Sequence, residues 1–212
     1  MLCAMVAGEC RAGYLPFGVQ NDVALSTVTG GGWTQIYRGN YNENVLPSTM
    51  FGGAQQYLLI GAIRDDLTTI DVLAAALTTD VLLPTGFNAP HTANGAEWYY
   101  NLNLSIGFAG LGDTINQQSA DTNGLAERDR LSWHASGGMI NGGWRSGSNN
   151  AFNNGIDMNN STLWDRIVFT ANASDLFDDG SQVPEPASMA LLAMGAFGFW
   201  GVGRRRKAVD AA

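Results

Sequence analysis

Several short segments of the chain alternate hydrophobic and polar positions, which predicts β-strands. Trp33–Tyr37 and Trp98–Ile106 follow a period of two and are rich in strand-forming residues. Gln56–Ile63 is a short apolar run that is typical of a buried strand. Arg130–His134 and Leu163–Thr170 predict two further strands. We therefore expect a mainly β fold built as a single domain.

The segment Thr68–Asp80 has an ambiguous pattern. Its Ala-rich middle favours helix, whereas the Thr, Ile and Val residues at its flanks favour strand. We expect a short helix or a turn there, so that the β-rich domain carries one or two short helices. Long loops rich in Gly, Asn and Ser separate the predicted strands, above all Gly137–Ser161.

The last hydrophobic segment differs from the others in its length and in its flanks. Ala187–Gly203 is uncharged over 17 residues, which is about the lower limit for a transmembrane helix. Four clustered cations follow it, and such cations resist crossing a bilayer and stay on the cytoplasmic side. The pattern predicts a C-terminal transmembrane helix that ends at a cytoplasmic stop made by Arg204, Arg205, Arg206 and Lys207.

A short polar motif, Val183, Pro184, Glu185 and Pro186, precedes this apolar span. The order of Pro-Glu-Pro motif, hydrophobic helix and Arg-rich tail resembles the PEP-CTERM sorting signal of Gram-negative bacteria. The resemblance implies export, transient membrane anchoring and processing by an exosortase-type membrane enzyme. It also implies a host that makes exopolysaccharide. An ordinary C-terminal membrane anchor is the alternative.

The N-terminal segment is consistent with export. Met1–Ala12 is rich in small and apolar residues and ends in alanine, as a secretory signal does before its cleavage site. Its cationic and apolar regions are incomplete, so we expect either the remnant of a signal peptide or a start codon assigned too late. The expected organisation is a signal remnant at 1–12, a β-rich extracellular domain at 13–174, an acidic linker at 175–182, the sorting signal at 183–207 and a tail at 208–212.

The charge of the exported part is strongly negative. Between Gly13 and Pro186 there are 17 acidic residues, six arginines and no lysine, which is a balance of −11. Such a surface repels nucleic acid, and it attracts divalent cations. The only cysteines, Cys3 and Cys10, lie in the expected signal remnant, so we expect neither a disulfide nor thiolate chemistry in the mature domain.

A second resemblance concerns the body of the chain. Gly31–Tyr41 (GGWTQIYRGNY) is similar to the opening strand of fibrinogen-like domains. An acidic, Asn-containing loop at Asp121–Asp129 and a second Gly-Gly-Trp at Gly142–Trp144 follow, in the order of that family's calcium loop and ligand-binding region. The resemblance implies calcium-assisted binding of a carbohydrate, although the cysteines of the family are missing here.

Oxygen ligands alternate along Asp121–Asp129, with a glycine that permits a turn. Calcium takes six to eight oxygen ligands from flexible loops, so this segment is a candidate calcium site. The alternative is an Asx-turn whose acids are neutralised by Arg128 and Arg130. The candidate ligands are Asp121, Asn123, Glu127 and Asp129.

The tryptophans suggest both core and ligand contacts. Trp98, Trp133 and Trp164 lie in predicted strands, and we expect them in the core. Trp144 lies in a polar loop, and together with Arg145 and Asn149 it is the candidate ligand contact, because exposed aromatic rings stack on sugars. The alternative is that Trp144 also fills the core.

No pattern in the sequence carries an enzymatic mechanism. Ser132 and His134 share one strand face, but a nucleophile also needs an oriented base and an oxyanion hole, and no G-x-S-x-G element is present. We therefore expect a non-enzymatic protein of the cell surface or extracellular matrix, a structural or interaction component associated with exopolysaccharide. The alternatives are a calcium-assisted carbohydrate-binding module of fibrinogen-like type and, third, a secreted hydrolase.

Overall fold

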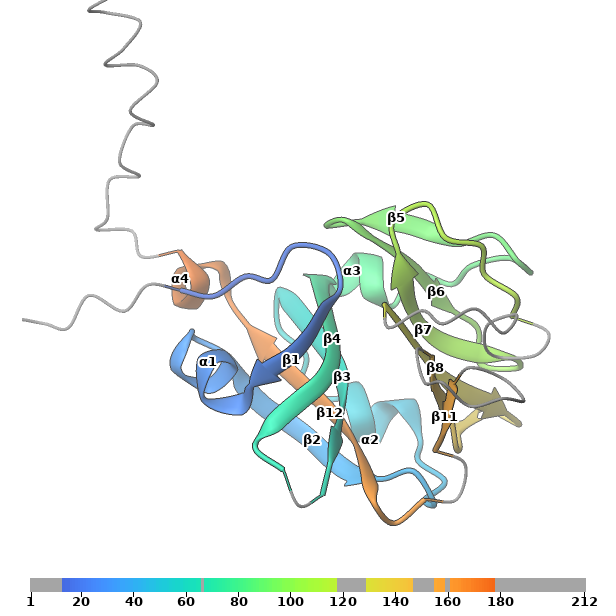
Figure 1. The fold of residues 1–212 in the computed structure, drawn as a ribbon. Coiled ribbons are helices and arrows are strands. Elements are labelled where there is room, and N and C mark those ends of the chain that lie inside the picture. Colours follow the sequence, from blue (N-terminus) through green and yellow to red (C-terminus); the bar gives the residue numbers. More distant parts are fainter. Residues whose placement is uncertain (1–12, 66, 118–128, 147–154, 159–160, 178–212) are drawn as a thin grey trace, which may run out of the picture. The chain divides into compact units, whose positions relative to one another are not determined.

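Two antiparallel sheets form the part of the chain that the computed structural model describes, residues 13–65, 67–117, 129–146, 155–158 and 161–177 (Figure 1). The prediction of a mainly β domain is confirmed. Four short helices accompany the strands in these residues, namely α1 (Leu25–Gly30), α2 (Pro47–Phe51), α3 (Thr78–Val81) and α4 (Ala173–Leu176).

The first sheet has five strands, and its central strands are long and apolar. The strand near the C-terminal end of the fold is inserted between two strands from its N-terminal half, so the sheet joins segments that are far apart in sequence. The strands follow the spatial order β1 (Gln20–Ala24), β4 (Thr69–Leu77), β3 (Tyr57–Arg64), β12 (Trp164–Ala171) and β2 (Thr34–Asn40).

The second sheet is built from the middle of the chain, mainly by neighbouring strands that pair in sequence order. The short strand β9 (Met139–Ile140) pairs with β8 outside the main path of the sheet. The spatial order is β11 (Gly155–Asp157), β10 (Trp144–Ser146), β8 (Arg130–Ser136), β7 (Ser105–Gly110), β6 (Ala96–Tyr100) and β5 (His91–Ala93).

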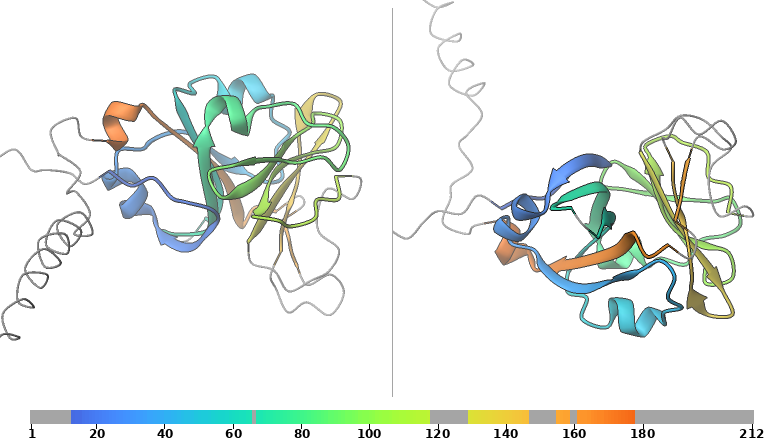
Figure 2. Two further views of the ribbon diagram at one scale, coloured as in Figure 1. Left: turned by 90° about the horizontal axis from the view of Figure 1, so that it is seen from above. Right: turned by 60° about the horizontal axis from the view of Figure 1, so that its bottom comes forward.

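The first sheet is covered on both faces. Its inner face packs against the second sheet through one large apolar cluster, which includes Ile60 and Val168 from the first sheet and Trp98 and Trp133 from the second. Its outer face carries a separate cluster that includes Val28 of α1 and Leu176 of α4. Figure 2 shows α1 (blue) and α4 (orange) on the side of the first sheet that faces away from the second. This double burial explains why Gln56–Ile63 is apolar without alternation.

The expectation of a helix or turn over Thr68–Asp80 is wrong for most of the segment. Thr69–Leu77 forms β4, a strand of nine residues that pairs with β1 on one side and β3 on the other, and only Thr78–Val81 is helical. Its alanines are buried between the two apolar clusters, where small side chains let the layers approach. Tertiary packing therefore overrides the helix propensity of alanine.

The single strand expected over Trp98–Ile106 is two strands, β6 and β7, joined by a tight turn. The Asn101 side chain accepts a hydrogen bond from the Asn103 amide at 3.0 Å, and the Leu104 amide donates to the Asn101 carbonyl at 3.1 Å. Asparagine side chains favour such turns because they bond the backbone two residues on. The local bonding of Asn101 thus interrupts an otherwise alternating pattern.

A buried arginine lies on the inner face of the first sheet. Arg166 of β12 is fully buried, and its two terminal nitrogens donate to the carbonyls of Asn40, Glu43, Tyr41 and Gly142 at 3.1–3.2 Å. Its guanidinium also lies 4.7 Å from the centre of the Tyr41 ring. The Tyr41 hydroxyl accepts the indole N–H of Trp133 at 2.7 Å. Arg166, Tyr41 and Trp133 therefore link the two sheets by polar contacts inside the core.

Candidate functional site

Most of the residues predicted for sorting and for calcium lie outside the described part of the chain. This holds for the sorting motif Val183, Pro184, Glu185 and Pro186, for the cations Arg204–Lys207, and for Asp121, Asn123 and Glu127. Asp129 is described and exposed, and its carboxylate accepts a hydrogen bond from the Asn21 amide at 2.5 Å. Across the described ranges no group of three or more His, Cys, Asp or Glu side chains could hold a metal ion. The calcium site stays a prediction.

The predicted ligand contact falls partly within the structure. Trp144 and Arg145 belong to β10, where Trp144 pairs with Ser132 of β8 and with Asp157 of β11. Asn149 lies outside the described residues. The segment around Trp144 is thus a strand, although the sequence indicated a polar loop, and ligand binding by Trp144, Arg145 and Asn149 stays a prediction.

The three tryptophans expected in the core are found there. Trp98, Trp133 and Trp164 are all buried in the cluster between the two sheets. Ser132 and His134 both lie in β8, as expected; Ser132 is buried and His134 is half-buried. Residues two apart in a strand point to the same face of the sheet, so the proximity of Ser132 and His134 follows from the strand geometry and indicates no catalytic role.

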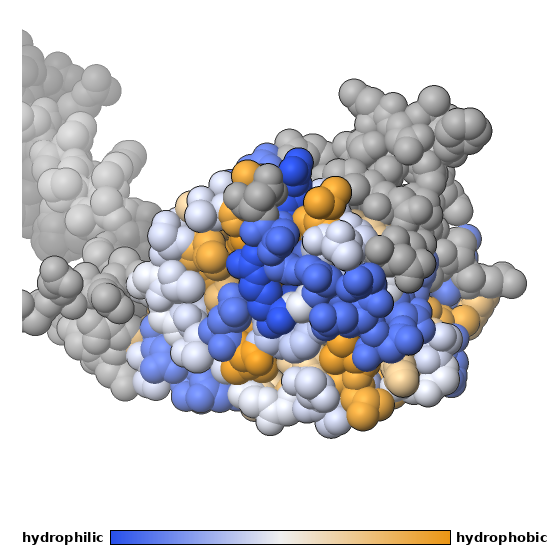
Figure 3. Space-filling view, turned by 90° about the horizontal axis from the view of Figure 1, so that it is seen from below, coloured by the Kyte–Doolittle hydropathy of each residue, from blue (hydrophilic) through white to orange (hydrophobic). Residues whose placement is uncertain are grey.

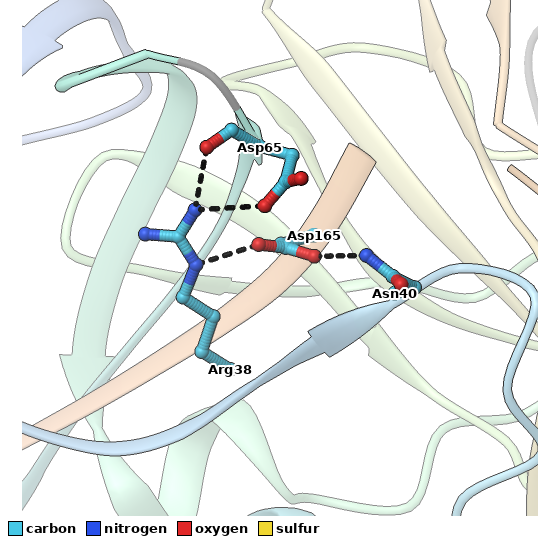
Figure 4. Close-up of polar contacts among 4 residues, drawn as sticks. All are labelled: Arg38, Asn40, Asp65 and Asp165. Atoms are coloured by element: carbon cyan, nitrogen blue, oxygen red, sulfur yellow. Dashed lines mark hydrogen bonds and ion pairs between the residues drawn. The ribbon is translucent and has the colours of Figure 1, made fainter. Parts of the chain in front are cut away.

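A polar cluster that reaches the surface was not among the predicted sites. We call it the Asp165 cluster; it consists of Arg38, Asn40, Asp65 and Asp165 (Figure 4). Arg38 and Asn40 come from β2, Asp165 comes from the neighbouring strand β12, and Asp65 directly follows β3. Three adjacent strands therefore bring these side chains together.

Asp165 is the centre of this cluster. One carboxylate oxygen accepts a hydrogen bond from Arg38 Nε at 2.6 Å, and the other accepts from Asn40 Nδ2 at 2.5 Å. Its side chain is only 5% exposed, and a buried carboxylate requires such partners to offset the loss of water. Both oxygens are engaged, which argues against Asp165 as a free general base or nucleophile.

Arg38 is held by two further contacts on its other side. Its Nη2 atom lies 3.4 Å from the carbonyl oxygen of Asp65 and 3.8 Å from the Asp65 carboxylate. In Figure 4 the remaining nitrogen of the guanidinium points away from both aspartates. The side chain of Arg38 is 29% exposed, whereas that of Asp65 is 65% exposed. The cluster thus has a buried anchor, Asp165, and an exposed partner, Asp65.

At the Asp165 cluster, the outer face of the first sheet changes from apolar to polar residues. Arg38 pairs with Ile167 and Asn40 pairs with Asp165, so the polar residues continue the face on which Ile167 packs beneath the helices. The turn after β3 and the start of β12 lie at the bottom of Figure 1. Seen from below, this end of the fold gathers strongly hydrophilic residues with hydrophobic residues beside them (Figure 3). The outer face is therefore apolar under α1 and α4 and polar at its other end.

The sequence contains an indication of this cluster in the strand that carries Asp165. Asp165 and Arg166 place two charges inside an otherwise apolar strand, which requires a partner for each of them. Arg38 and Asn40 directly follow the predicted strand Trp33–Tyr37, and because β2 continues to Asn40 these two residues share a face. The missing information was which strands are neighbours, because β2 and β12 are more than a hundred residues apart.

Comparison with known protein families identifies a C-terminal segment of the chain. Residues 182–207 match the family model described as the PEP-CTERM protein-sorting motif, as the sequence predicts. The chain is therefore an exported protein that is transiently anchored in the membrane before it reaches the cell surface or the medium. The motif also implies processing by an exosortase-type enzyme.

The comparisons bear on the sorting signal and not on the folded body. A search of curated proteins found no match, and a search of solved structures found none either. The similarity to fibrinogen-like domains is thus not shown. No helix among the described residues is long and apolar enough to cross a membrane, and Ala187–Gly203, where the sequence predicts one, lies outside them.

Proposed function

We propose that this protein is a non-enzymatic component of the cell surface or extracellular matrix that associates with exopolysaccharide. The observation that carries the proposal is the match of residues 182–207 to the PEP-CTERM motif, since that signal directs the β-rich body out of the cell. The resemblance implies a host that makes exopolysaccharide, and this polymer is then a partner that the exported body can meet outside the cell.

The charge and the polar contacts of the body support the same proposal. A balance of −11 between Gly13 and Pro186 suits a soluble extracellular domain and disfavours partners such as nucleic acid. The Asp165 cluster offers hydrogen-bond donors and acceptors at the surface, as the recognition of a neutral polar ligand requires. Both oxygens of its buried carboxylate already accept hydrogen bonds, so Asp165 is not available as a catalytic base. These features favour binding over catalysis.

Binding to the polymer is tested with the secreted protein and exopolysaccharide purified from the producing culture. We expect the protein to co-sediment with the polysaccharide, and we expect the molar mass of the polysaccharide to stay constant during incubation. A protein that stays in the supernatant at every polysaccharide concentration would refute the association. A fall in molar mass would identify a hydrolase.

Sorting makes a prediction about the mass of the mature protein. We expect the extracellular form to lack everything from about Val183 onward, because the PEP-CTERM motif implies cleavage by an exosortase-type enzyme. Intact-mass analysis of the protein recovered outside the cell measures this directly. Glu185→Ala should leave the uncleaved chain in the membrane fraction, whereas Asp210→Ala in the tail should be processed normally. Extracellular protein that still carries Arg204–Lys207 would contradict the prediction.

A further inference from the structure

We propose that Asp65, Arg38 and Leu163 form a contact for the hydroxyl groups of a neutral saccharide. The inference rests on the proposed association with exopolysaccharide and names both the place and the chemistry of that contact. Asp65 and Leu163 are the exposed members, and Arg38 lies between Asp65 and the buried Asp165.

Asp65 and Arg38 place an acceptor beside a donor. A sugar hydroxyl donates one hydrogen bond and accepts others, so it is best satisfied by a carboxylate and a guanidinium side by side. Asp65 Oδ1 and Arg38 Nη2 are 3.8 Å apart, which is longer than a direct hydrogen bond, so the Asp65 carboxylate keeps bonding capacity for a ligand. Arg38 Nη2 donates to the Asp65 carbonyl at 3.4 Å, and the other terminal nitrogen of Arg38 points away from both aspartates (Figure 4). Neighbouring hydroxyls on one sugar ring can then donate to Asp65 and accept from Arg38.

Arg38 is held in place before any ligand arrives. Its Nε atom is fixed by Asp165 at 2.6 Å, and Asn40 fixes the other oxygen of Asp165. An arginine that is already ordered loses little conformational entropy on binding, whereas a free surface arginine loses much more. Asp165 is therefore a positioning residue, and Arg38 is a contact that it holds in order.

An apolar side chain, Leu163, lies beside the polar pair. Leu163 is 64% exposed, and its carbonyl accepts the Asp65 amide at 3.0 Å, so the two residues are neighbours at the end of the strand ladder. Sugar rings present C–H groups next to their hydroxyls, and an exposed aliphatic side chain beside a polar pair matches that alternation. Asp65 thus supplies hydrogen bonding and Leu163 supplies apolar contact.

The charges around the site select a neutral ligand over an acidic one. Arg38 is already compensated by Asp165 and Asp65, and the exported body carries a balance of −11. An incoming uronate would meet the exposed carboxylate of Asp65 and the negative field of the whole domain. We therefore expect a neutral glucan or galactan to bind and a polyuronate to bind more weakly.

The test compares four single variants of the secreted protein in affinity electrophoresis through gels containing a neutral glucan, a galactan or a polyuronate. Asp65→Ala removes the exposed acceptor, and Leu163→Ala removes the apolar contact. Leu111→Ala is the matched control for Leu163, because Leu111 is 63% exposed on a loop of the second sheet. Asp22→Asn is the control for Asp65, since Asp22 is another exposed aspartate and asparagine tolerates its positive φ of 55°.

We expect Asp65→Ala to weaken binding about tenfold, which is the effect of losing one hydrogen bond to a charged group, and Leu163→Ala to weaken it by a smaller factor. Both controls should bind like the wild type, and all four variants should keep the melting temperature. Should Asp65→Ala lower the melting temperature, amide shifts of Asp65 and Leu163 on titrating the wild type with a neutral oligosaccharide measure the same contact without a substitution.

Three outcomes would overturn the inference. Binding that survives both Asp65→Ala and Leu163→Ala moves the contact elsewhere and leaves the association with polysaccharide intact. Stronger binding of the polyuronate would refute the neutral ligand. A wild-type protein that binds no polysaccharide in any gel would refute the association itself, and this inference with it.

Discussion

Replacing Arg166 by methionine is expected to lower the free energy of unfolding by about 3–5 kcal/mol, the range seen when one member of a buried charged network is removed. The side chain is fully buried and donates hydrogen bonds to four backbone carbonyls. These are the carbonyls of Asn40, Glu43, Tyr41 and Gly142. Methionine fills a similar volume and donates nothing, so these carbonyls lose their buried partner. Each buried acceptor left without a donor costs about 1–3 kcal/mol before the structure relaxes.

The effect should be large because Arg166 acts on both sheets. Its carbonyl partners Asn40 and Tyr41 lie at the end of β2, and Gly142 lies two residues before β10 of the second sheet. Burial lowers the pKa of the Arg166 guanidinium from its ordinary value, but the group keeps its proton at neutral pH because that value starts far above it. The network therefore carries a buried positive charge that carbonyl dipoles and the Tyr41 ring stabilise.

Thermal unfolding followed by circular dichroism measures this effect. For a domain of this size, a loss of that magnitude lowers the melting temperature by on the order of 10 °C. Arg64→Met is the control, since Arg64 is an exposed arginine at the end of β3, and it should change the free energy by less than about 0.5 kcal/mol. Arg166→Lys should lie between the two, because lysine keeps the charge without the planar fork. Equal melting temperatures for Arg166→Met and Arg64→Met would show that the network contributes nothing.

The sequence was sufficient to predict the β class of the fold. It also predicted the two central strands whose residues form continuous or alternating apolar runs. The expected strand at Gln56–Ile63 corresponds to β3 at Tyr57–Arg64, and the one at Leu163–Thr170 corresponds to β12 at Trp164–Ala171. β4 was missed because alanine is a strong helix former in isolation, and only the burial of β4 between two apolar layers selects the strand. Local propensity cannot supply that information, since both layers come from distant segments.

The composition of the chain predicted that the folded domain ends at residue 174, which is slightly too early. The expected acidic linker begins at Asp175, whereas the structure places Asp175 and Leu176 in α4. Asp175 accepts the backbone amide of Asn172 at 2.9 Å and so caps the helix, and Leu176 is buried in the outer cluster. An acidic residue in the first turn of a helix has a structural role that its charge alone does not reveal.

The Asp165 cluster could not be predicted because it depends on strand order. Asp165 is separated from Arg38 by 127 residues and from Asn40 by 125, and no local spacing relates them. The unpaired charge in an apolar strand predicts that partners exist, but their identity follows only from the insertion of β12 between β3 and β2. The sorting motif is the opposite case, because all its parts are adjacent in sequence and the chain order alone identifies it.

The two glycines before Trp33 are the second place where a small change should have a large effect. Gly31 and Gly32 lie where the beginning of the fold meets its end: the Tyr14 amide donates to the Gly31 carbonyl at 3.0 Å, and the Trp33 indole donates to the Tyr14 carbonyl at 2.6 Å. A Cβ atom on Gly32 would lie 2.1 Å from the carbonyl oxygen of Asp175, and the φ angle of Gly32 is +98°. The Gly-Gly-Trp element thus lets α4 approach the backbone.

Gly32→Ala should therefore destabilise the fold by about 3 kcal/mol. A positive φ costs an L-residue about 1–2 kcal/mol, and the new methyl group must also displace α4, whose Leu176 side chain is buried in the outer cluster. Gly30→Ala, two residues away, is the control: a Cβ there meets nothing within 4 Å, and Gly30 is the last residue of α1. Alanine is the better helix former by up to about 1 kcal/mol, so Gly30→Ala should leave the stability unchanged or raise it. Urea unfolding of both variants measures the difference, and a Gly32→Ala midpoint at or above that of Gly30→Ala would show that the contact between Gly32 and α4 does not constrain the fold.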